Sequence, residues 1–595
     1  MKKILFALVA LTASLQLMAI PARPGRFTVT QPDGTRLVLQ RHGDEWGHWL
    51  TDTSGRMVVQ DEDGYYRSAR GITVDEIRRN GAARRALANQ RRAARRAVET
   101  GPVAIGRKHF LVILVEFTNK HFSTSDDPKA AFTALLNEEG YSVNGGTGSA
   151  RDYYYDNSHG LFEPVFDVYG PVQTDTTYAY YGANSPGGDD LRPEEAVIEG
   201  CRKLDEEIDF TRYDNDGDGK VDLVFMYYAG KGEADGGASN TIWPHQWEIS
   251  SAGKSLELDG MVIDSYACTN EVTNNRMCGI GTACHEFAHA MGLPDFYDTD
   301  YENNGMSAGL FSFSTMDGGA YNNSGRTPPY FNIEERMMLG WLDRDVLREF
   351  PETGSYALLP MHENVAYMTP TDQDGEYFVY ECRNSEGWDS ALPAHGLLVY
   401  HVDRSDRKLK VYGSRVTARD LWDHWGVLNG INENGSHPCF YIVPAPDPGN
   451  LLFGHYKWGG SYYFDESYAP QIPFPGSKAV TRFIPKSWNG VEGDITFRDI
   501  DYAGGVVTLK ARVFTGEVDY PTIADAGAYR AGDRFTFSLV PSDAEEAPSS
   551  VAWFFDDEPV QADSVTLTAG EHVVEASLTY ADGRKRVLTL EITAN

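Results

Sequence analysis

Hydrophobic and polar positions divide the first half of the chain into segments with different periods. Over residues 26–69 they alternate, and clusters of Pro, Asp and Gly interrupt the alternation, which predicts a small β-rich unit. The continuous apolar run at 109–117 predicts a buried strand that opens a larger α/β domain. Helices are predicted at 149–155 and, beginning at a proline, at 193–208, and a further strand at 223–228.

The second half shows shorter apolar alternations separated by Gly, Asp and Pro. Over residues 346–514 they predict a β-rich accessory domain, with strands at 376–382 and 397–402. Over residues 515–595, spaced strands predict an all-β, immunoglobulin-like sandwich of about 80 residues. Its expected strands lie at 534–539, 550–555, 564–567, 571–580 and 585–592.

A short motif near the middle of the chain carries the strongest chemical signal. His285 and His289 are four residues apart and would share one face of a helix, so both imidazoles reach a single zinc ion. Glu286 would lie beside the zinc-bound water. Gly292 allows the chain to turn after the helix, and Asp295 then stands where a third zinc ligand is needed. An ordinary surface helix with two exposed histidines is the alternative.

A second, acidic motif lies just before the predicted strand at 223–228. Asp214, Asp216, Asp218 and Asp222 occupy positions 1, 3, 5 and 9 of a calcium loop, with a glycine at position 6. Position 12 is Phe225, where an EF-hand has a glutamate, so the motif is not a complete EF-hand. We expect a structural calcium ion completed by a ligand from elsewhere in the chain. A simple Asp/Gly turn is the alternative.

Length and charge limit the class of protein. A chain of 595 residues divides into about three to five domains. Lys+Arg 53 against Asp+Glu 86 gives a net charge of −33, which argues against nucleic acid or an anionic membrane as a partner. The charge fits a secreted, calcium-containing protein, but it would equally serve solubility alone.

The first residues are typical of a secretory signal peptide. Lys2 and Lys3 precede an apolar run over 4–18, and Ala19 is followed by a proline-containing break. We therefore predict a signal peptide at 1–19 and a protein secreted to the extracellular space or the cell surface. We find no other apolar stretch long enough to cross a membrane, and we expect a soluble monomer without a transmembrane segment.

An arginine-rich segment interrupts the acidic composition before residue 101. Its arginines form pairs separated mainly by alanines, namely Arg78-Arg79, Arg84-Arg85, Arg91-Arg92 and Arg95-Arg96. Because exposed basic pairs are targets of arginine-directed proteases, we predict a propeptide at 20–100 with a helical linker that an activating protease cuts. The alternative is a solvated helix docked on an acidic surface.

The six cysteines lack the C-x-x-C spacing of a zinc ribbon. In an exported protein Cys268 would form a local disulfide with Cys278 or Cys284, or the cysteines would remain buried thiols. No cysteine lies in the first 200 residues, so a propeptide thiolate does not cap the zinc. Latency would instead use a carboxylate, a histidine such as His42 or His48, the free amino terminus or occlusion of the cleft.

Several motifs follow one another in a fixed order along residues 152–319. They are Asp152-Tyr153-Tyr154 with Asp156-Asn157-Ser158, the acidic loop at 213–219, Trp243-Pro244-His245, the zinc motif at 285–295, and Ser314-Thr315-Met316-Asp317-Gly318-Gly319. This series resembles the immune inhibitor A family of secreted bacterial metallopeptidases. The resemblance covers about 106–342 and continues more weakly through 381–384, 387–389 and 396–401.

The resemblance implies a zinc endopeptidase made as a zymogen, with a catalytic domain at 101–345 whose α/β (α+β) fold is similar to metzincins. Met316 matches the methionine turn that lies beneath the metal in such folds, where its soft side chain suits a close contact. This chain has Asp295 where most metzincins have a third histidine. Asp298, Glu334 and Glu335 are competitors for that ligand position.

The resemblance also implies hydrolysis of peptide bonds in protein or peptide substrates. Zinc would polarise the scissile carbonyl and lower the pKa of its bound water, and Glu286 would move the proton to the leaving amine. His245, Tyr321 or Tyr330 would support the oxyanion or the substrate, although a purely structural role fits His245 equally well. Two rival classes remain open: a surface binding protein with a non-catalytic metal site, and a metal-dependent hydrolase of non-peptide substrates.

Overall fold

The structure is a computed structural model that describes residues 20–595, apart from 24, 45–46, 61–63, 70–72, 82–103, 186–188, 300–306, 412–413, 459–460, 514–520, 542–546, 557 and 582–584. The predicted signal peptide and three of the four arginine pairs lie outside the described residues. The described part is mixed α/β and ends in an all-β region.

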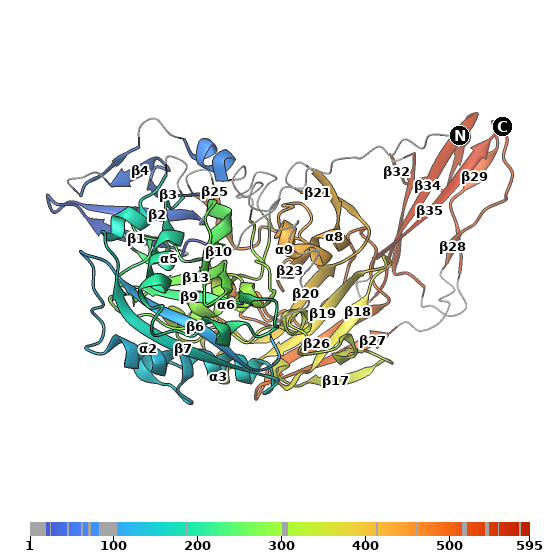
Figure 1. The fold of residues 1–595 in the computed structure, drawn as a ribbon. Coiled ribbons are helices and arrows are strands. Elements are labelled where there is room, and N and C mark those ends of the chain that lie inside the picture. Colours follow the sequence, from blue (N-terminus) through green and yellow to red (C-terminus); the bar gives the residue numbers. More distant parts are fainter. Residues whose placement is uncertain are drawn as a thin grey trace, which may run out of the picture.

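An antiparallel meander of consecutive strands forms the N-terminal sheet, coloured blue in Figure 1. Its strands are β1 (Arg26–Thr30), β2 (Arg36–Asp44), β3 (Gly47–Asp52), β4 (Met57–Gln60) and β5 (Tyr66–Ser68). In the turn between β1 and β2, the Asp33 carboxylate accepts a hydrogen bond from the Thr35 amide at 2.9 Å, as short polar turn residues do. A β-rich unit is therefore present where the alternating pattern predicts it.

A mostly parallel sheet forms the centre of the α/β region. Its strands are β6 (Gly106–Glu116), β7 (Phe162–Gln173), β9 (Val224–Tyr228), β10 (His245–Glu248) and β13 (Ser265–Asn270), in the order β10-β13-β9-β6-β7. Neighbouring strands are parallel except β10, which pairs antiparallel at one edge. A central parallel strand is covered on both faces, which explains the continuous apolar run of β6.

Helices cover both faces of this sheet. They are α2 (Pro128–Asn137), α3 (Ala150–Asn157), α5 (Pro193–Lys203) and α6 (Gly281–Met291), with the short α4 (Tyr178–Gly182) beside α5. Phe110, Val112 and Leu114 of β6 share one core with α2, α3 and α6. The alternate residues Leu111 and Ile113 share a second core with α5. Alternate side chains of this strand thus pack into the cores on opposite faces of the sheet.

Helix α5 is shorter than the sequence pattern predicts, because it ends at Lys203 instead of residue 208. The Leu204 amide closes the last turn by bonding to carbonyls of the preceding turn. Three acidic residues follow at 205–207. Negative charges at the C-terminal end of a helix oppose its dipole, which disfavours continuation.

The chain after residue 346 is mainly β-structure. One sheet has the order β16-β18-β19-β20-β23 and another the order β17-β27-β26; the strands are β16 (Leu347–Glu349), β17 (Gly354–Leu358), β18 (Ala366–Pro370), β19 (Glu376–Arg383), β20 (Gly396–Asp403), β23 (Phe440–Ile442), β26 (Ile495–Ala503) and β27 (Val506–Val513). Val379, Leu398 and Tyr400 belong to the same core as helix α6. The sheet of β19 and β20 therefore packs directly against the α/β region.

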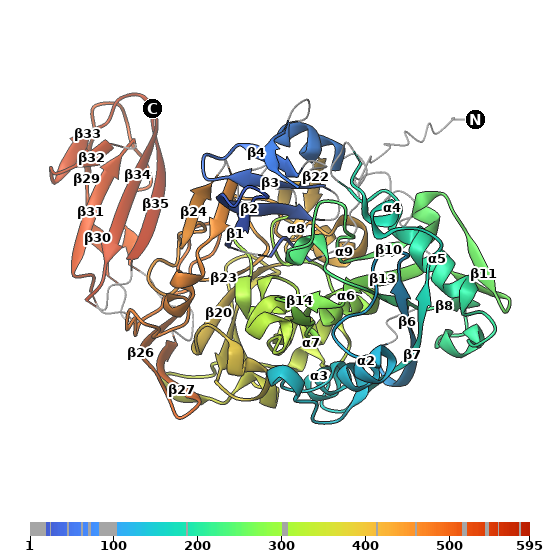
Figure 2. The same cartoon turned by 90° about the vertical axis from the view of Figure 1, so that its left-hand side faces the viewer.

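The last strands have their own core and lie apart from the remainder in Figures 1 and 2. They are β28 (Thr522–Ile523), β29 (Arg534–Thr536), β30 (Leu539–Val540), β31 (Ser550–Phe555), β32 (Glu558–Val560), β33 (Ser564–Thr566), β34 (Gly570–Thr579) and β35 (Lys585–Ala594). The pairings between these described strands are antiparallel. This arrangement is compatible with the expected sandwich, whose immunoglobulin-like type stays a prediction.

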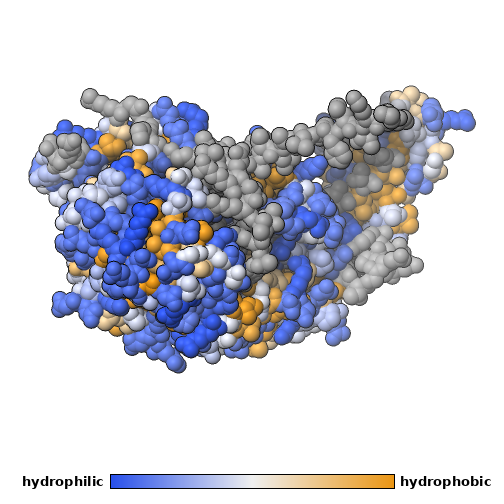
Figure 3. All heavy atoms as spheres, in the orientation of Figure 1, coloured by the Kyte–Doolittle hydropathy of each residue, from blue (hydrophilic) through white to orange (hydrophobic). Residues whose placement is uncertain are grey.

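Further short strands and α-helices lie between these elements. They are β8 (Lys220–Val221), β11 (Leu256–Leu258), β12 (Met261–Ile263), β14 (Val272–Thr273), β15 (Arg276–Met277), α7 (Ile333–Met338), β21 (Lys408–Val411), β22 (Ser414–Thr417), α8 (Ala418–Asp423), α9 (Trp425–Leu428), β24 (His455–Trp458) and β25 (Ser461–Phe464). All six cysteines are buried free thiols, as in the second of the two alternatives for them. Among the helices described, none has the length and apolarity to cross a membrane. Hydrophilic residues predominate over the α/β region in Figure 3, in keeping with the net charge of −33.

Candidate metal centre

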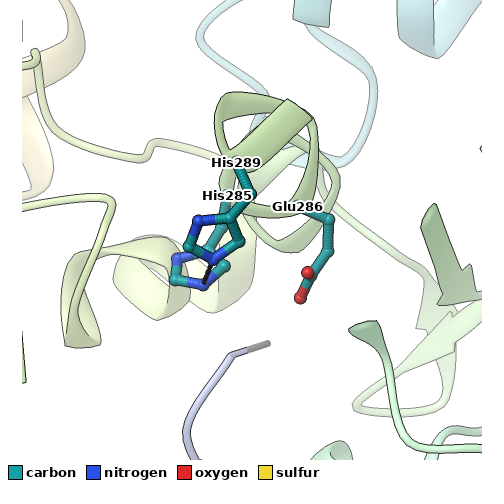
Figure 4. A group of neighbouring side chains, drawn as sticks. All are labelled: His285, Glu286 and His289. Atoms are coloured by element: carbon teal, nitrogen blue, oxygen red, sulfur yellow. Dashed lines mark hydrogen bonds between the residues drawn. The ribbon is translucent and has the colours of Figure 1, made fainter. Parts of the chain in front are cut away.

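Helix α6 has one apolar face and one face of reactive side chains. The Phe287 ring meets the Phe110 ring of β6 edge to face at 4.6 Å, a favourable aromatic geometry that sets the helix on the sheet. His285, Glu286 and His289 lie together on another side of the helix (Figure 4), and each is at most 2% exposed. The predicted spacing therefore places these three side chains in one buried group.

Backbone carbonyls fix the protonation pattern of both histidines. His285 Nδ1 lies 2.7 Å from the Thr315 carbonyl oxygen and His289 Nδ1 lies 2.8 Å from that of Leu293. A carbonyl only accepts hydrogen bonds, so each Nδ1 carries the proton and donates it. Each Nε2 then offers a lone pair, as a metal-binding imidazole must.

Asp295 completes a triangle of donor atoms. Gly292 ends helix α6 at φ 122°, a conformation open to glycine, and the chain then returns toward the histidines. The two Nε2 atoms are 3.0 Å apart, and Oδ1 of Asp295 lies 3.4 Å from each. Ligands about 2.0–2.1 Å from a tetrahedral zinc ion lie about 3.3–3.4 Å from one another. Two imidazoles and a carboxylate at this spacing fit zinc.

Asn429 holds Asp295 in place from a distant part of the chain. Its Nδ2 donates to Oδ2 of Asp295 at 2.7 Å, and its Oδ1 accepts from the Asp295 amide at 2.9 Å. The other oxygen of Asp295, Oδ1, is thereby left to face the histidines. Asn429 lies 134 residues after Asp295, and no motif in the sequence identifies it.

The charges at the centre follow from burial and from close neighbours. Burial by itself raises the pKa of Asp295, but the two neighbouring imidazoles outweigh it and hold the pKa at about 2. Asp295 is therefore deprotonated at neutral pH, as a carboxylate ligand of a metal must be. Burial raises the pKa of Glu286 to about 8, although the neighbouring His285 and the hydrogen bond from the Ile20 amide oppose this shift.

Comparisons with known proteins agree with this geometry. The model of the family described as "Immune inhibitor A peptidase M6, catalytic domain" matches residues 104–337. Residues 104–337 thus match the catalytic domain of this peptidase family, and we refer to them as the peptidase domain. This domain includes the central sheet, helix α6 and all three donor residues.

Two curated relatives are similar to the peptidase domain. "Pre-pro-metalloprotease PrtV" of Vibrio cholerae serotype O1 is 27% identical over 230 residues, which is 34% of this chain and 25% of that protein. "Immune inhibitor A" of Bacillus thuringiensis subsp. alesti is 24% identical over 266 residues, which is 38% of each chain. The chain thus spans between a quarter and two fifths of the length of these relatives.

A solved structure of wild-type OgpA from Akkermansia muciniphila aligns with 84% of this chain and 96% of its own length at 8% identity. The TM-score is 0.20, which is too low for a comparison of folds.

The other carboxylates considered as zinc ligands have partners elsewhere in the structure. Glu334 accepts hydrogen bonds from Tyr377 and Arg404. Glu335 accepts one from Ser314 and caps helix α7. Asp298 accepts one from the Ser307 amide. Asp295, and none of these three carboxylates, is the one that contacts both histidines.

The predicted methionine turn lies next to His285 of helix α6. Met316 is fully buried, and its amide donates to Ser314 Oγ at 3.0 Å. The residue between them, Thr315, supplies the carbonyl that orients His285. The turn therefore contacts the donor set through its backbone, and the role of the Met316 side chain beneath a metal stays a prediction.

The three residues proposed for oxyanion or substrate contacts have different surroundings. Both ring nitrogens of His245 are engaged, one at 2.6 Å from the Trp243 carbonyl and one at 2.9 Å from the Tyr266 hydroxyl. Burial lowers the pKa of His245 to about 4, so the ring is neutral. The Tyr330 ring stacks on His362, whereas the Tyr321 hydroxyl reaches the N-terminal segment. These surroundings favour Tyr321 for a substrate contact.

The acidic loop of the peptidase domain gathers three of its four predicted calcium ligands. Carboxylate oxygens of Asp214, Asp216 and Asp218 lie within 4.8 Å of one another. Asp222 instead accepts a hydrogen bond from the Asn215 side chain at 2.6 Å, and burial raises its pKa to about 6. The carboxylate of Asp222 is therefore not part of the group formed by the other three, and the calcium site stays a prediction.

The N-terminal segment lies against the active helix of the peptidase domain. The backbone nitrogen of Ile20 donates to Glu286 Oε1 at 3.1 Å, and the Ile20 side chain is fully buried. Trp243 Nε1 donates to the Ile20 carbonyl at 3.1 Å, and the Tyr321 hydroxyl donates to the Pro21 carbonyl at 2.8 Å. Among the latency options raised by the sequence, these contacts favour the amino terminus and occlusion of the cleft.

Proposed function

We propose that this protein is a secreted zinc metalloendopeptidase that is made as a zymogen. The observation that carries the proposal is the buried triangle of His285, His289 and Asp295 donor atoms with the Glu286 carboxylate beside it. The family of residues 104–337 supports the class of reaction. The signal peptide, the zymogen state and the secreted location are part of this proposal.

The side chains at the centre have separate tasks. The three donors would hold zinc, which when bound polarises a peptide carbonyl and lowers the pKa of a coordinated water. Glu286 is fully buried, and its carboxylate accepts a proton during attack and returns it to the leaving amine. Thr315 and Leu293 hold the two imidazoles by their Nδ1 protons and prevent the rings from turning.

Latency would arise because the N-terminal segment occupies the place of a substrate. The Ile20 nitrogen donates a hydrogen bond to one oxygen of the Glu286 carboxylate. Removal of residues 1–19 would make this nitrogen the amino terminus. The segment is anchored to the N-terminal sheet by a bond from the Ala22 amide to the Gly43 carbonyl. Cleavage in the part of the arginine-rich segment after residue 81, which lies outside the described residues, would then allow sheet and segment to leave together.

A structural calcium ion at the acidic loop is the second part of the proposal. Asp214, Asp216 and Asp218 converge at the surface, and carboxylate oxygens are the ligands that calcium prefers. The ion would stabilise the connection between α5 and β9 and would not take part in hydrolysis.

Hydrolysis of casein tests the proposed function. The full chain, before and after limited cleavage in the arginine-rich segment, is assayed with a chelator and with zinc restored afterwards. We expect activity that depends on cleavage, is lost with the chelator and returns with zinc. Zinc binding without hydrolysis would instead support a binding protein, and cleavage of esters but not of casein would support a different hydrolase.

A further inference from the structure

Given the proposed peptidase function, on which this inference rests, the N-terminal segment shows how a substrate would lie in the cleft. Glu286 returns a proton to the leaving amine, which belongs to the residue just after the cleaved bond. The nitrogen that contacts Glu286 belongs to Ile20. Ile20 therefore stands in the first position after the scissile bond, and Arg23 stands in the fourth.

Main-chain bonds hold this segment in a way that any peptide could share. Trp243 and Tyr321 donate to the carbonyls of the first and second positions. The amide of the fourth position donates to the Ala234 carbonyl at 3.3 Å. Such bonds give affinity without sequence preference, whereas pockets for the side chains give specificity.

The side chain at the first position enters an apolar pocket. Ile20 clusters with Ala234, Trp243 and Ala320. The two alanines leave room beside the indole for a branched aliphatic side chain. Because an apolar pocket discriminates only modestly between side chains of similar size, this position alone does not define the substrate.

The side chain at the fourth position makes a directed ionic contact. Arg23 Nη1 lies 2.7 Å from Asp235 Oδ1 and 3.0 Å from Asn274 Oδ1. The Asp235 side chain is only 7% exposed while that of Arg23 is 29% exposed, so the carboxylate is a fixed part of the cleft wall. A partly buried charged hydrogen bond contributes more than an exposed ion pair.

A second carboxylate beside this position is also neutralised by the N-terminal sheet. His48 Nε2 of β3 lies 3.0 Å from Glu233 Oε2, and the His48 ring stacks on Trp243 at 4.4 Å. When the sheet and the N-terminal segment leave together, Glu233 loses His48 and Asp235 loses Arg23. The cleft is then negatively charged beside the position that Arg23 occupies.

We propose that Asp235, assisted by Asn274, forms a subsite for an arginine or lysine at the fourth position after the scissile bond. The same substrates would carry an aliphatic side chain at the first position. The peptidase would thus select protein substrates with a basic residue on the leaving-group side. Its own N-terminal segment, Ile20-Pro21-Ala22-Arg23, has this pattern.

Fluorogenic peptides that differ only at the fourth position test the proposal. Each contains Ile-Pro-Ala-X after the expected bond, with Arg, Gln or Glu as X, and is assayed with the activated chain. We expect kcat/KM to be about tenfold higher for Arg than for Gln. Asp235→Asn removes this preference, and Asp235→Arg reverses it in favour of Glu. The matched control Asp205→Asn, on an exposed turn after α5, retains it.

A binding measurement gives the same answer without any variant. The free tetrapeptides Ile-Pro-Ala-Arg and Ile-Pro-Ala-Gln are added to activated wild type as inhibitors of casein hydrolysis. The arginine peptide should inhibit at about tenfold lower concentration. Equal inhibition, or equal cleavage of all three fluorogenic peptides by an enzyme that degrades casein, overturns the subsite and leaves the proposed function standing. Failure to cleave casein or any peptide overturns both.

Discussion

Removal of the Asn429 side chain should weaken zinc binding through Asp295. Asn429 has φ 31°, in the left-handed region, so Asn429→Gly removes the side chain without adding backbone strain. The charged bond to Oδ2 contributes about 1.5 kcal/mol and the bond from the Asp295 amide about 1 kcal/mol. Their sum of about 2.5 kcal/mol corresponds to roughly 70-fold in affinity, within the 10–100-fold range expected for a residue that orients a metal ligand.

A competition titration with a zinc chelator on the full chain measures this effect. Asn434→Ala is the matched control, because Asn434 is a half-buried asparagine of the same loop that bonds to the Lys410 carbonyl and not to Asp295. The control should keep the wild-type affinity. A folded Asn429→Gly protein with unchanged zinc affinity would show that Asp295 is not a ligand, and the reasoning from the donor triangle would fail.

Three further predictions concern packing, pH and calcium. Phe287→Ala should lower the free energy of unfolding by about 3–5 kcal/mol in denaturant titration; a loss below about 1 kcal/mol would contradict the packing of α6. Burial alone lowers the pKa of His48, but Glu233 raises it to about 9, with Asp190 also facing the ring. This contribution to stability is complete below about pH 6.5 and is lost as pH rises through about 9. The melting temperature of wild type should therefore fall over that range, whereas that of His48→Gln should not show this fall. Calcium at about 100 times its Kd should raise stability by about 2.7 kcal/mol, and Asp216→Asn should abolish the effect; a rise retained in the variant would place the ion elsewhere.

The parts of the centre that depend on local spacing were predictable from the sequence. The four-residue interval of His285 and His289 and the Gly292 turn to Asp295 place all three donors by helix geometry and one reversal of the chain. The apolar run of β6 likewise predicts a strand covered on both faces. These signals lie within a few residues of the atoms they position.

Long-range contacts were not predictable in the same way. Asn429 reaches Asp295 from 134 residues away, and Ile20 reaches Glu286 across 266 residues. Neither has a spacing that marks it, because their positions depend on how whole sheets pack. Asp222 shows that a local spacing can also mislead. It matches a calcium motif by spacing, yet its carboxylate turns to Asn215 instead of the other three acids.

The most direct test of the central claim is the rate of casein hydrolysis by the activated chain with Glu286→Gln, measured together with its zinc content. The variant keeps the size of the side chain and the three donor atoms but cannot accept a proton. We expect one zinc ion per chain, as in wild type, and a rate about 10²–10⁴-fold lower. A zinc-loaded Glu286→Gln protein that hydrolyses casein at the wild-type rate would contradict the account.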